Sequence, residues 1–347
     1  MGKNYYIIPL FVPHEGCPHN CVFCNQSRIT GESERVTRDI AIKTIDEYLE
    51  TINSNNSTVE VSFFGGTFTA IREENQKELL EVAKHYKDKG LIDKIRLSTR
   101  PDYINEYILD YLKEYGVDII ELGVQSLIDD VLKLSGRGHS KEDVENASRL
   151  IKDYGFTLGH QLMIGLPGDT LDRDIQSVRD SIEMKPDIAR IYPALVIKDT
   201  PMEIMYKRGT FIPYTLEEAV EASKIVFKEY KSNDVKVIRI GLQPTENITL
   251  GKDIIAGPFH PAFRELVEAS ILEENLLSIA KEHISSSSFD ILINPKNLSK
   301  LYADKKKYFN DLNSKLKDIN INVVQDSAID RESIIIKSGA NEFKINL

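Results

Sequence analysis

The stretch that decides the fold is YYIIPLFVPHEGCPHNCVFC, residues 5–24, in which an apolar segment runs directly into a cluster of cysteines. Residues 5–11 have the length and apolar character of a buried strand. The loop that follows holds Cys17, Cys21 and Cys24 in a C-x3-C-x2-C spacing. These are the only cysteines in a chain of 347 residues, so their clustering needs a chemical explanation.

Three explanations fit the cysteines themselves. An iron–sulfur cubane has four irons, so three thiolates would leave one iron open to another ligand. Zinc would take the three thiolates together with His14 or His19 in a closed tetrahedral site. The third alternative is three buried thiols without a metal. An odd number of clustered cysteines excludes a disulfide framework and indicates a reducing compartment.

The next part of the chain alternates strand-length apolar runs with helix-length amphipathic segments. Further strands are expected at residues 59–64, 94–98, 119–124, 157–164 and 188–192. Helices are expected at residues 38–51, 73–89, 105–115, 141–154 and 171–184. This repetition predicts a parallel sheet, open or curled into a partial barrel, whose site lies at the carboxyl ends of the strands.

After about residue 200 the pattern changes. A helix is expected at 216–230, an irregular segment at 240–262 and a long helix at 261–283. A run of four serines at 285–288 suggests a linker. Beyond it, strands near 289–293, 319–324, 333–337 and 342–345 and a Lys-rich helix from 297 to about 317 indicate a small α+β unit. We therefore predict three regions: 1–240, a bridge at 241–284, and 285–347.

Composition sets limits on the function. The net charge of −10 argues against a general polyanion binder, although a local basic patch remains compatible with it. The sequence contains no apolar run of about 20 residues and no secretory signal, so we expect a cytoplasmic protein without a membrane span.

With Phe23 directly before the third cysteine, the cysteine motif resembles that of the radical S-adenosylmethionine (radical SAM) superfamily. The sequences GGT at 65–67 and GLPG at 165–168 are similar to further motifs of that superfamily, in the same order. The resemblance implies that Cys17, Cys21 and Cys24 bind a [4Fe–4S] cluster. It also implies reductive cleavage of S-adenosylmethionine to a 5′-deoxyadenosyl radical, which takes hydrogen from a substrate.

Five motifs narrow the resemblance to one branch. They are FGGTF (64–68), TRPDY (99–103), LGVQS (122–126), RGH (137–139) and YPALV (192–196). Their order resembles that of the elongator catalytic subunit family, and coproporphyrinogen dehydrogenase-like enzymes share some of them. The similarity covers about residues 5–265, and the remainder is too short for that family's acetyltransferase domain. We expect a partial (βα)6 radical SAM barrel of the α/β class with a small C-terminal α+β domain.

The resemblance also implies a set of cofactor contacts, near the cysteines and the strand ends. They are Phe23, Gly65, Gly66, Thr67, Ser98, Gln125, Arg137, Gln161 and Leu195. The GGT motif would receive the methionyl amino group, and Arg137 would bind the carboxylate, which suits a guanidinium fork. Ser98 and Gln125 would face the ribose or the methionine, and Gln161 the ribose. Leu195 would offer backbone atoms near the adenine.

The resemblance implies a radical SAM enzyme whose substrate the sequence does not name. An external electron donor of ferredoxin or flavodoxin type is implied as well. The lysines at 297–317 on an acidic chain favour a folded RNA such as tRNA as partner. Two alternatives stay open: a small-molecule oxidoreductase of coproporphyrinogen dehydrogenase-like type, and a non-catalytic zinc- or RNA-binding protein.

Overall fold

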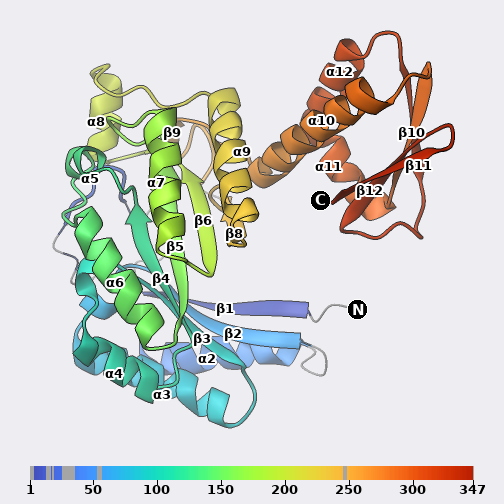
Figure 1. Ribbon diagram of the computed structural model, residues 1–347. Helices are drawn as coiled ribbons and strands as arrows, with labels where there is room; N and C mark the ends of the chain where they lie inside the picture. The colour runs from blue at the N-terminus through green and yellow to red at the C-terminus, as the bar shows by residue number, and fades with distance from the viewer. Residues whose placement is uncertain are drawn as a thin grey trace. The chain divides into compact units, whose positions relative to one another are not determined.

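The computed structural model describes residues 4–12, 17, 19–25, 36–52, 57–244 and 248–346, and the chain divides into two compact units (Figure 1). The first unit comprises Met1–Ala219 and Ile225–Phe259. The second comprises Val220–Lys224 and His260–Leu347. The segment 241–284, predicted as a bridge, is divided between the two units.

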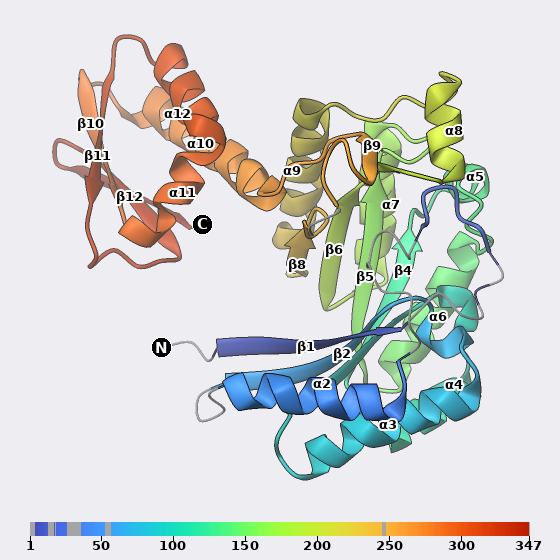
Figure 2. The ribbon, with the colours of Figure 1, turned by 180° about the vertical axis from the view of Figure 1, so that it is seen from behind.

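A parallel sheet of seven strands forms the core of the first unit, in the order β1-β2-β3-β4-β5-β6-β8. The strands are β1 (Asn4–Val12), β2 (Ser57–Gly65), β3 (Lys94–Thr99), β4 (Ile119–Gln125), β5 (Thr157–Ile164), β6 (Ile188–Pro193) and β8 (Lys236–Ile240). Every neighbouring pair is parallel. The sheet curls and carries its helices on the outer face (Figures 1 and 2), so the predicted partial barrel is confirmed.

Helices connect the successive strands. They are α2 (Arg38–Thr51), α3 (Glu73–Asp88), α4 (Glu106–Glu114), α6 (Lys141–Asp153), α7 (Leu171–Glu183) and α9 (Leu216–Ser232). Several of these helices begin after a residue whose side chain accepts a backbone N–H of the first turn. Ser140 and Thr215 form complete capping boxes in this way. The strands and helices predicted here are confirmed, with small differences at their ends.

Several short elements were not predicted. These are the helices α5 (Asp129–Leu134) and α8 (Pro201–Lys207), the strand β8, and the small pair β7 (Val196–Ile197) and β9 (Ile254–Ala256). The two helices span too few turns to show a helical period. In β8, Lys236 and Arg239 interrupt the apolar pattern on which the strand prediction depended.

A buried hydrogen-bond chain ties β5 to the helices that cover it. His160 on β5 is 1% exposed, and its Nδ1 lies 2.8 Å from the Ser181 hydroxyl on α7. Its Nε2 lies 2.9 Å from the Ser148 hydroxyl on α6. Tyr230 on α9 donates its hydroxyl to Ser181 at 2.8 Å. His160 therefore holds the layer between sheet and helices together.

The pH dependence of stability tests this chain. Burial lowers the pKa of His160 to about 3, so its contribution is complete above about pH 6.5 and is lost as the pH falls toward 3. We predict that His160→Gln, which cannot gain a proton, is less stable at neutral pH. Its deficit should shrink by about 1.4 kcal/mol per pH unit below about pH 6.5. Urea unfolding at neutral pH and at about pH 5 measures this, and a constant deficit would contradict it.

The second unit is a four-stranded sheet with helices packed on it, which confirms the predicted small α+β domain. The strands β10 (Ser288–Ile293), β11 (Asn320–Gln325), β12 (Ser333–Ser338) and β13 (Asn341–Asn346) lie in the order β11-β10-β12-β13. The helices are α10 (Phe263–His283), α11 (Leu298–Leu301) and α12 (Ala303–Lys315). The core includes Leu272, Leu276, Phe289, Ile291, Leu312 and Ile336.

The single Lys-rich helix predicted at 297–317 is instead the two helices α11 and α12. At the start of α12, Asp304, Lys305 and Lys306 have positive φ angles of 47°, 52° and 69°. Such angles belong to left-handed backbone and cannot continue a right-handed helix. The lysines therefore do not share one helical stripe. Among the described residues, no helix combines the length and apolar character needed to cross a membrane.

Candidate functional site

Backbone hydrogen bonds hold the cysteine loop, described at residues 17 and 19–24, against two helices of the barrel. The N–H of Val22 donates to the carbonyl of Ser135, the residue that follows α5, at 2.9 Å. The carbonyl of Val22 accepts the N–H of Met202, in the first turn of α8, at 2.8 Å. Phe23 packs against an apolar cluster that includes Met202 and Phe211. The two unpredicted short helices thus position the loop.

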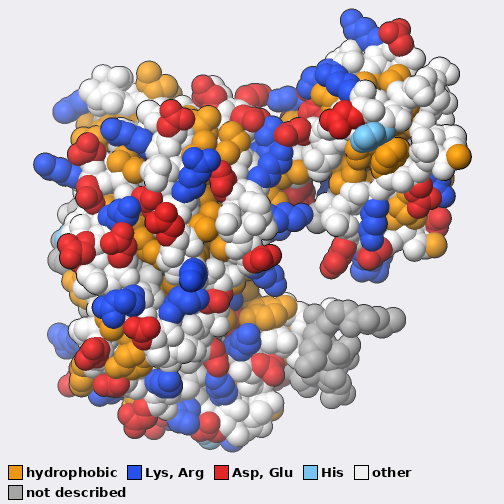
Figure 3. All heavy atoms as spheres, in the orientation of Figure 1, with side chains coloured by type: hydrophobic (Ala, Val, Ile, Leu, Met, Phe, Trp, Pro, Cys, Tyr) orange, Lys and Arg blue, Asp and Glu red, His pale blue; other side chains and the backbone are white. Residues whose placement is uncertain are grey.

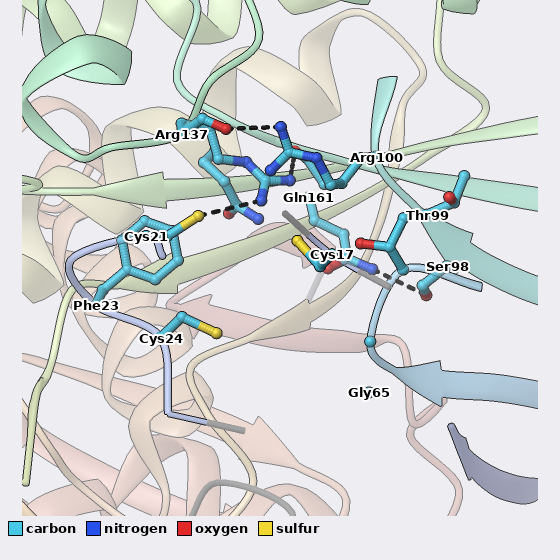
Figure 4. A pocket seen from close by; sticks show the side chains of 14 residues that line it. Cys17, Cys21, Phe23, Cys24, Gly65, Ser98, Thr99, Arg100, Arg137 and Gln161 are labelled. Carbon is cyan, nitrogen blue, oxygen red and sulfur yellow. Dashed lines mark hydrogen bonds between the residues drawn. The ribbon is translucent and has the colours of Figure 1, made fainter. Parts of the chain in front are cut away.

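The three cysteines line a single cavity of about 110 Å³ at the carboxyl ends of the strands (Figure 4). Its walls are Cys17, Cys21, Phe23, Cys24, Gly65, Gly66, Thr67, Ser98, Thr99, Arg100, Gly123, Gln125, Arg137 and Gln161. Eight of the nine residues predicted to contact a cofactor are among these. Leu195 is not: it is buried in an apolar cluster with Ile197, Ile248 and Ile254.

Gly65 ends β2 in a conformation that requires glycine. Its φ is +105°, and a Cβ there would lie 2.6 Å from the carbonyl oxygen of Val12. The next residue, Gly66, donates its N–H to that same oxygen at 2.8 Å, which extends the pairing of β1 and β2. The glycine pair therefore brings two strand ends together and leaves bare backbone facing the cavity.

Arg137 contacts the cysteine loop directly. Its Nη1 donates to the Cys21 sulfur at 3.6 Å, and its Nη2 donates to the Gly123 carbonyl at 2.5 Å (Figure 4). The side chain is buried, and its Nε has no hydrogen-bond partner. Burial lowers the pKa of Arg137, and the nearby charge of Cys21 partly offsets this. Both terminal nitrogens of Arg137 therefore already have hydrogen-bond partners within the protein.

Arg100 forms a second cationic wall. It is 1% exposed, and its Nε and Nη2 pair with the Asp102 carboxylate at 2.9 Å each. Nη2 also donates to the backbone carbonyl of Arg137 at 2.6 Å. Its Nη1 is buried without a partner. Burial works against the charge of Arg100, but its hydrogen bonds to Asp102 outweigh this and raise its pKa.

Gln161 links the cavity to the interior of the barrel. Its Nε2 donates to Ser98 Oγ at 3.2 Å and to Glu121 Oε2 at 2.8 Å. A carboxylate only accepts hydrogen bonds, so the amide nitrogen must face Glu121. The carbonyl oxygen of Gln161 is thereby the atom left for the cavity that this side chain lines.

Glu121 belongs to an ionic network that the sequence analysis missed. Glu121 and Glu60 are fully buried. Arg96 on β3 pairs with both of them, and Arg190 on β6 pairs with Glu121 across β5. Arg190 Nε lies 2.8 Å from Glu121, and Arg96 Nε lies 2.7 Å from Glu60. Burial alone raises the pKa of Glu121, but Arg190 and Arg96 outweigh it and hold that pKa below its usual value. Each charge interrupts an otherwise apolar strand, which was the signal available in the sequence.

The turn at 165–168, whose GLPG sequence resembles a superfamily motif, packs against α7. Gly165 has a φ of +71°, and the Tyr214 ring would lie 2.7 Å from a Cβ there. Asp174 on α7 accepts the Gly165 N–H at 3.1 Å and the Tyr214 hydroxyl at 2.9 Å. Burial, and then the neighbouring Asp169, raises the pKa of Asp174 to about 9. The turn does not belong to the cavity walls named above.

The donor set fits an iron–sulfur cluster better than zinc. Zinc would need its ligands within about 2.3 Å of one ion. Among the described residues, no three His, Cys, Asp or Glu side chains gather as ligands of a single ion. The His19 ring lies against Gly138 and 3.7 Å from Asp102, and His14 lies outside the described residues. A cubane spreads three thiolates over three irons, which suits thiols arranged around a cavity.

The described part of the chain is thus an α/β half-barrel protein with three cysteines around a cavity at its strand ends. Residues 11–180 match the family model of the radical SAM superfamily. Residues 186–273 match that of the radical SAM C-terminal domain. The chain belongs to the radical SAM superfamily of enzymes.

Individual relatives point to the elongator branch. The chain is 32% identical over 245 residues to tRNA uridine(34) acetyltransferase of Methanocaldococcus infernus, covering 59% of this chain and 46% of that protein. It is 29% identical over 255 residues to Elongator complex protein 3 of Bos taurus, covering 60% and 46%. The chain thus spans about half the length of these curated relatives.

A solved structure shows the same likeness. The archaeal Elp3 of Methanocaldococcus infernus, with its N-terminus deleted, superposes with a TM-score of 0.62 and 26% identity. The match covers 80% of this chain and 64% of that one. The elongator-like branch expected from the motifs is confirmed.

Two glycine substitutions test how the β2 end is built. Gly65→Ala combines an unfavourable φ with a clash against backbone, whereas Gly90→Ala has a φ of +68° and no atom within 4 Å of its Cβ. We predict that Gly90→Ala lowers the free energy of unfolding by about 1 kcal/mol, and Gly65→Ala by about 2–4 kcal/mol. Urea unfolding measures both. Equal losses would show that the close approach to Val12 contributes nothing.

Proposed function

We propose that Cys17, Cys21 and Cys24 hold one [4Fe–4S] cluster and that the cavity beside it takes S-adenosylmethionine. The observation that carries the proposal is that three thiols, two strand-end glycines and two buried arginines line one cavity. Arg100 pairs with the carboxylate of Asp102, whereas no carboxylate is found paired with Arg137 among the described residues, so the cavity wall carries an excess of buried positive charge. An anionic cluster with an amino acid carboxylate supplies the compensation that buried charge needs. Membership of the radical SAM superfamily supports the same assignment.

When bound, the cluster would supply the electron that cleaves S-adenosylmethionine reductively. The residues of this chain bind, orient and exclude water. Each arginine has one nitrogen without a partner, Nη1 in Arg100 and Nε in Arg137. Arg100 is the better candidate for the methionyl carboxylate, because both terminal nitrogens of Arg137 are engaged, by Cys21 and Gly123. The bare backbone of Gly65 and Gly66 would admit the methionyl amino group at close range.

The polar side chains on the β3–β5 side of the cavity would bind the ribose. Gln161 presents its carbonyl oxygen, which accepts a hydrogen bond from a hydroxyl. Ser98 accepts from Gln161 and keeps its own O–H to donate. Gln125 lines the same wall in a left-handed conformation, with a φ of 68°. The cofactor contact of Leu195 stays a prediction. An external low-potential donor of ferredoxin or flavodoxin type would supply the electron.

Metal analysis tests the cluster directly. After anaerobic reconstitution we predict about four irons and four sulfides per chain, and slow formation of 5′-deoxyadenosine once dithionite and S-adenosylmethionine are added. Cys21→Ala should lose both, since it removes the most buried of the three ligands. Ser232→Ala, an exposed change on α9, is the control. Stoichiometric zinc in place of iron would favour the non-catalytic alternative, and a full cluster in Cys21→Ala would remove the cysteines from this role.

We further propose that the substrate is a folded RNA of the tRNA class. The matched relatives include tRNA uridine(34) acetyltransferases, and the elongator-type motifs occur here in order. Within the second unit, Lys300 pairs with Glu268 and Lys315 with Glu273, so these two lysines already have acidic partners. On the face of the second unit drawn in Figure 3, Lys and Arg side chains lie among acidic ones. Lys305 and Lys306 are exposed at the left-handed turn of α12. This turn is the better candidate for contacts with phosphate.

Salt-dependent binding tests the RNA proposal. We predict that bulk tRNA binds at low salt and dissociates as salt rises, and that replacing Lys305, Lys306 and Lys307 with Glu weakens binding at least tenfold. A matched triple charge reversal in the first unit, at Lys43, Lys89 and Lys236, should have a smaller effect. Electrophoretic mobility shifts measure both, and iron content confirms that the barrel is intact. Absence of binding at low salt, or equal losses, would favour the small-molecule alternative.

A further inference from the structure

The guanidinium of Arg137 is held against one specific cysteine. Its Nη1 is 3.6 Å from the Cys21 sulfur, and Cys21 is 4% exposed. The second terminal nitrogen is fixed by the Gly123 carbonyl at 2.5 Å. The third nitrogen, Nε, is buried without a partner. The contact with Cys21 is thus made inside the protein, where water does not screen it.

Gly123 makes room for this arrangement. A Cβ at residue 123 would lie 2.8 Å from Arg137 Nη2, too close for the guanidinium to stay in place. The backbone of Gly123 is not in the left-handed region, so glycine is required here for space and not for conformation. Gly123 of the LGVQS motif and Arg137 of the RGH motif therefore belong together, because the guanidinium fits only where residue 123 has no side chain.

The backbone of Arg137 is held as well. Its carbonyl accepts a hydrogen bond from Arg100 Nη2 at 2.6 Å, and Arg100 is itself clamped by Asp102. Two residues on, His139 Nε2 lies 3.1 Å from the carbonyl of Val124. Both ends of the arginine are thus anchored to β4 or to the residues after β3. A cation fixed in this way keeps its distance from Cys21 constant.

We propose that Arg137 is a positioning residue that raises the reduction potential of the iron–sulfur cluster by donating a charged hydrogen bond to its ligand Cys21. The inference rests on the cluster assignment proposed above. Hydrogen bonds to cluster sulfurs and nearby charge are among the factors that set such potentials. The step concerned adds one electron from a low-potential donor to the cluster, and no bond forms or breaks. A fixed positive charge favours the more negative, reduced form.

Redox titration of the full chain tests the proposal. Wild type, Arg137→Gln, Arg137→Lys and Gly123→Ala are reconstituted anaerobically and titrated with dithionite while paramagnetic resonance follows the reduced cluster. At the wild-type midpoint, we expect the ratio of reduced to oxidised cluster to fall about tenfold in Arg137→Gln, equivalent to ~59 mV for a one-electron couple. Arg137→Lys keeps the charge without the fork, so its shift should be smaller.

Gly123→Ala is the decisive variant, because it leaves the charge of Arg137 in the protein and displaces its guanidinium. Its Cβ would also lie 3.1 Å from Gln125 Nε2, but that amide carries no charge. We expect its potential to fall as well, with iron and sulfide content unchanged. Arg179→Gln, an exposed arginine on α7, is the control and should titrate like wild type. Full clusters with unchanged potentials in Arg137→Gln and Gly123→Ala would overturn this inference alone. A wild-type chain that takes up no four-iron cluster would overturn the proposed function with it.

Discussion

The pairing of two buried glutamates with two buried arginines inside the barrel is the constraint on which the rest of the site depends. Glu60 and Glu121 have no exposed surface, so each must keep a cationic partner or bear a large desolvation cost. Their partners Arg96 and Arg190 come from different strands, so the network joins β2, β3, β4 and β6. A slip of one residue in any of these strands would turn its charge toward the helices.

The same network determines what the cavity presents. On β3, Arg96 and Ser98 are two residues apart and share a face, and on β5 Gln161 lies beside Arg190 in the ladder. The ion pairs and the polar cavity wall therefore lie on the same inner face of the sheet, one next to the other along the strands. Glu121 connects them, since it holds both arginines and orients the amide of Gln161. The ion pairs inside the barrel thus determine that Gln161 turns its carbonyl oxygen, and not its amide nitrogen, toward the cavity.

Much of this arrangement could be predicted from the sequence, for physical reasons. Apolar strands that alternate with amphipathic helices specify a parallel α/β sheet, whatever the exact bounds of each element. The parallel strands then bring their carboxyl ends to one edge of the sheet. That edge gathers eight of the nine predicted cofactor residues around one cavity with the cysteines. Leu195 lies elsewhere because the chain after β6 turns into β7 and its own apolar cluster.

What could not be predicted depends on partners distant in sequence. Which charged residues inside strands pair with one another follows only from the register of the strands. The ion pair of Glu121 with Arg190 was therefore not predicted. Arg137 was expected to bind a ligand carboxylate, but which atoms occupy its fork depends on Gly123, fourteen residues earlier. The left-handed turn at Lys305 and Lys306 contradicts local helix propensity, and propensity was the only signal available there.

The way the cysteine loop is attached also bears on how the protein matures. The peptide groups of Val22 bond to the residue after α5 and to the first turn of α8, and its side chain packs on the apolar cluster beside them. Both helices follow the loop by more than a hundred residues, so this attachment forms only once these later parts of the barrel are in place. In zinc fingers the metal drives folding. Under the cluster assignment proposed above, the scaffold would fold first and the cluster would be added to a folded protein.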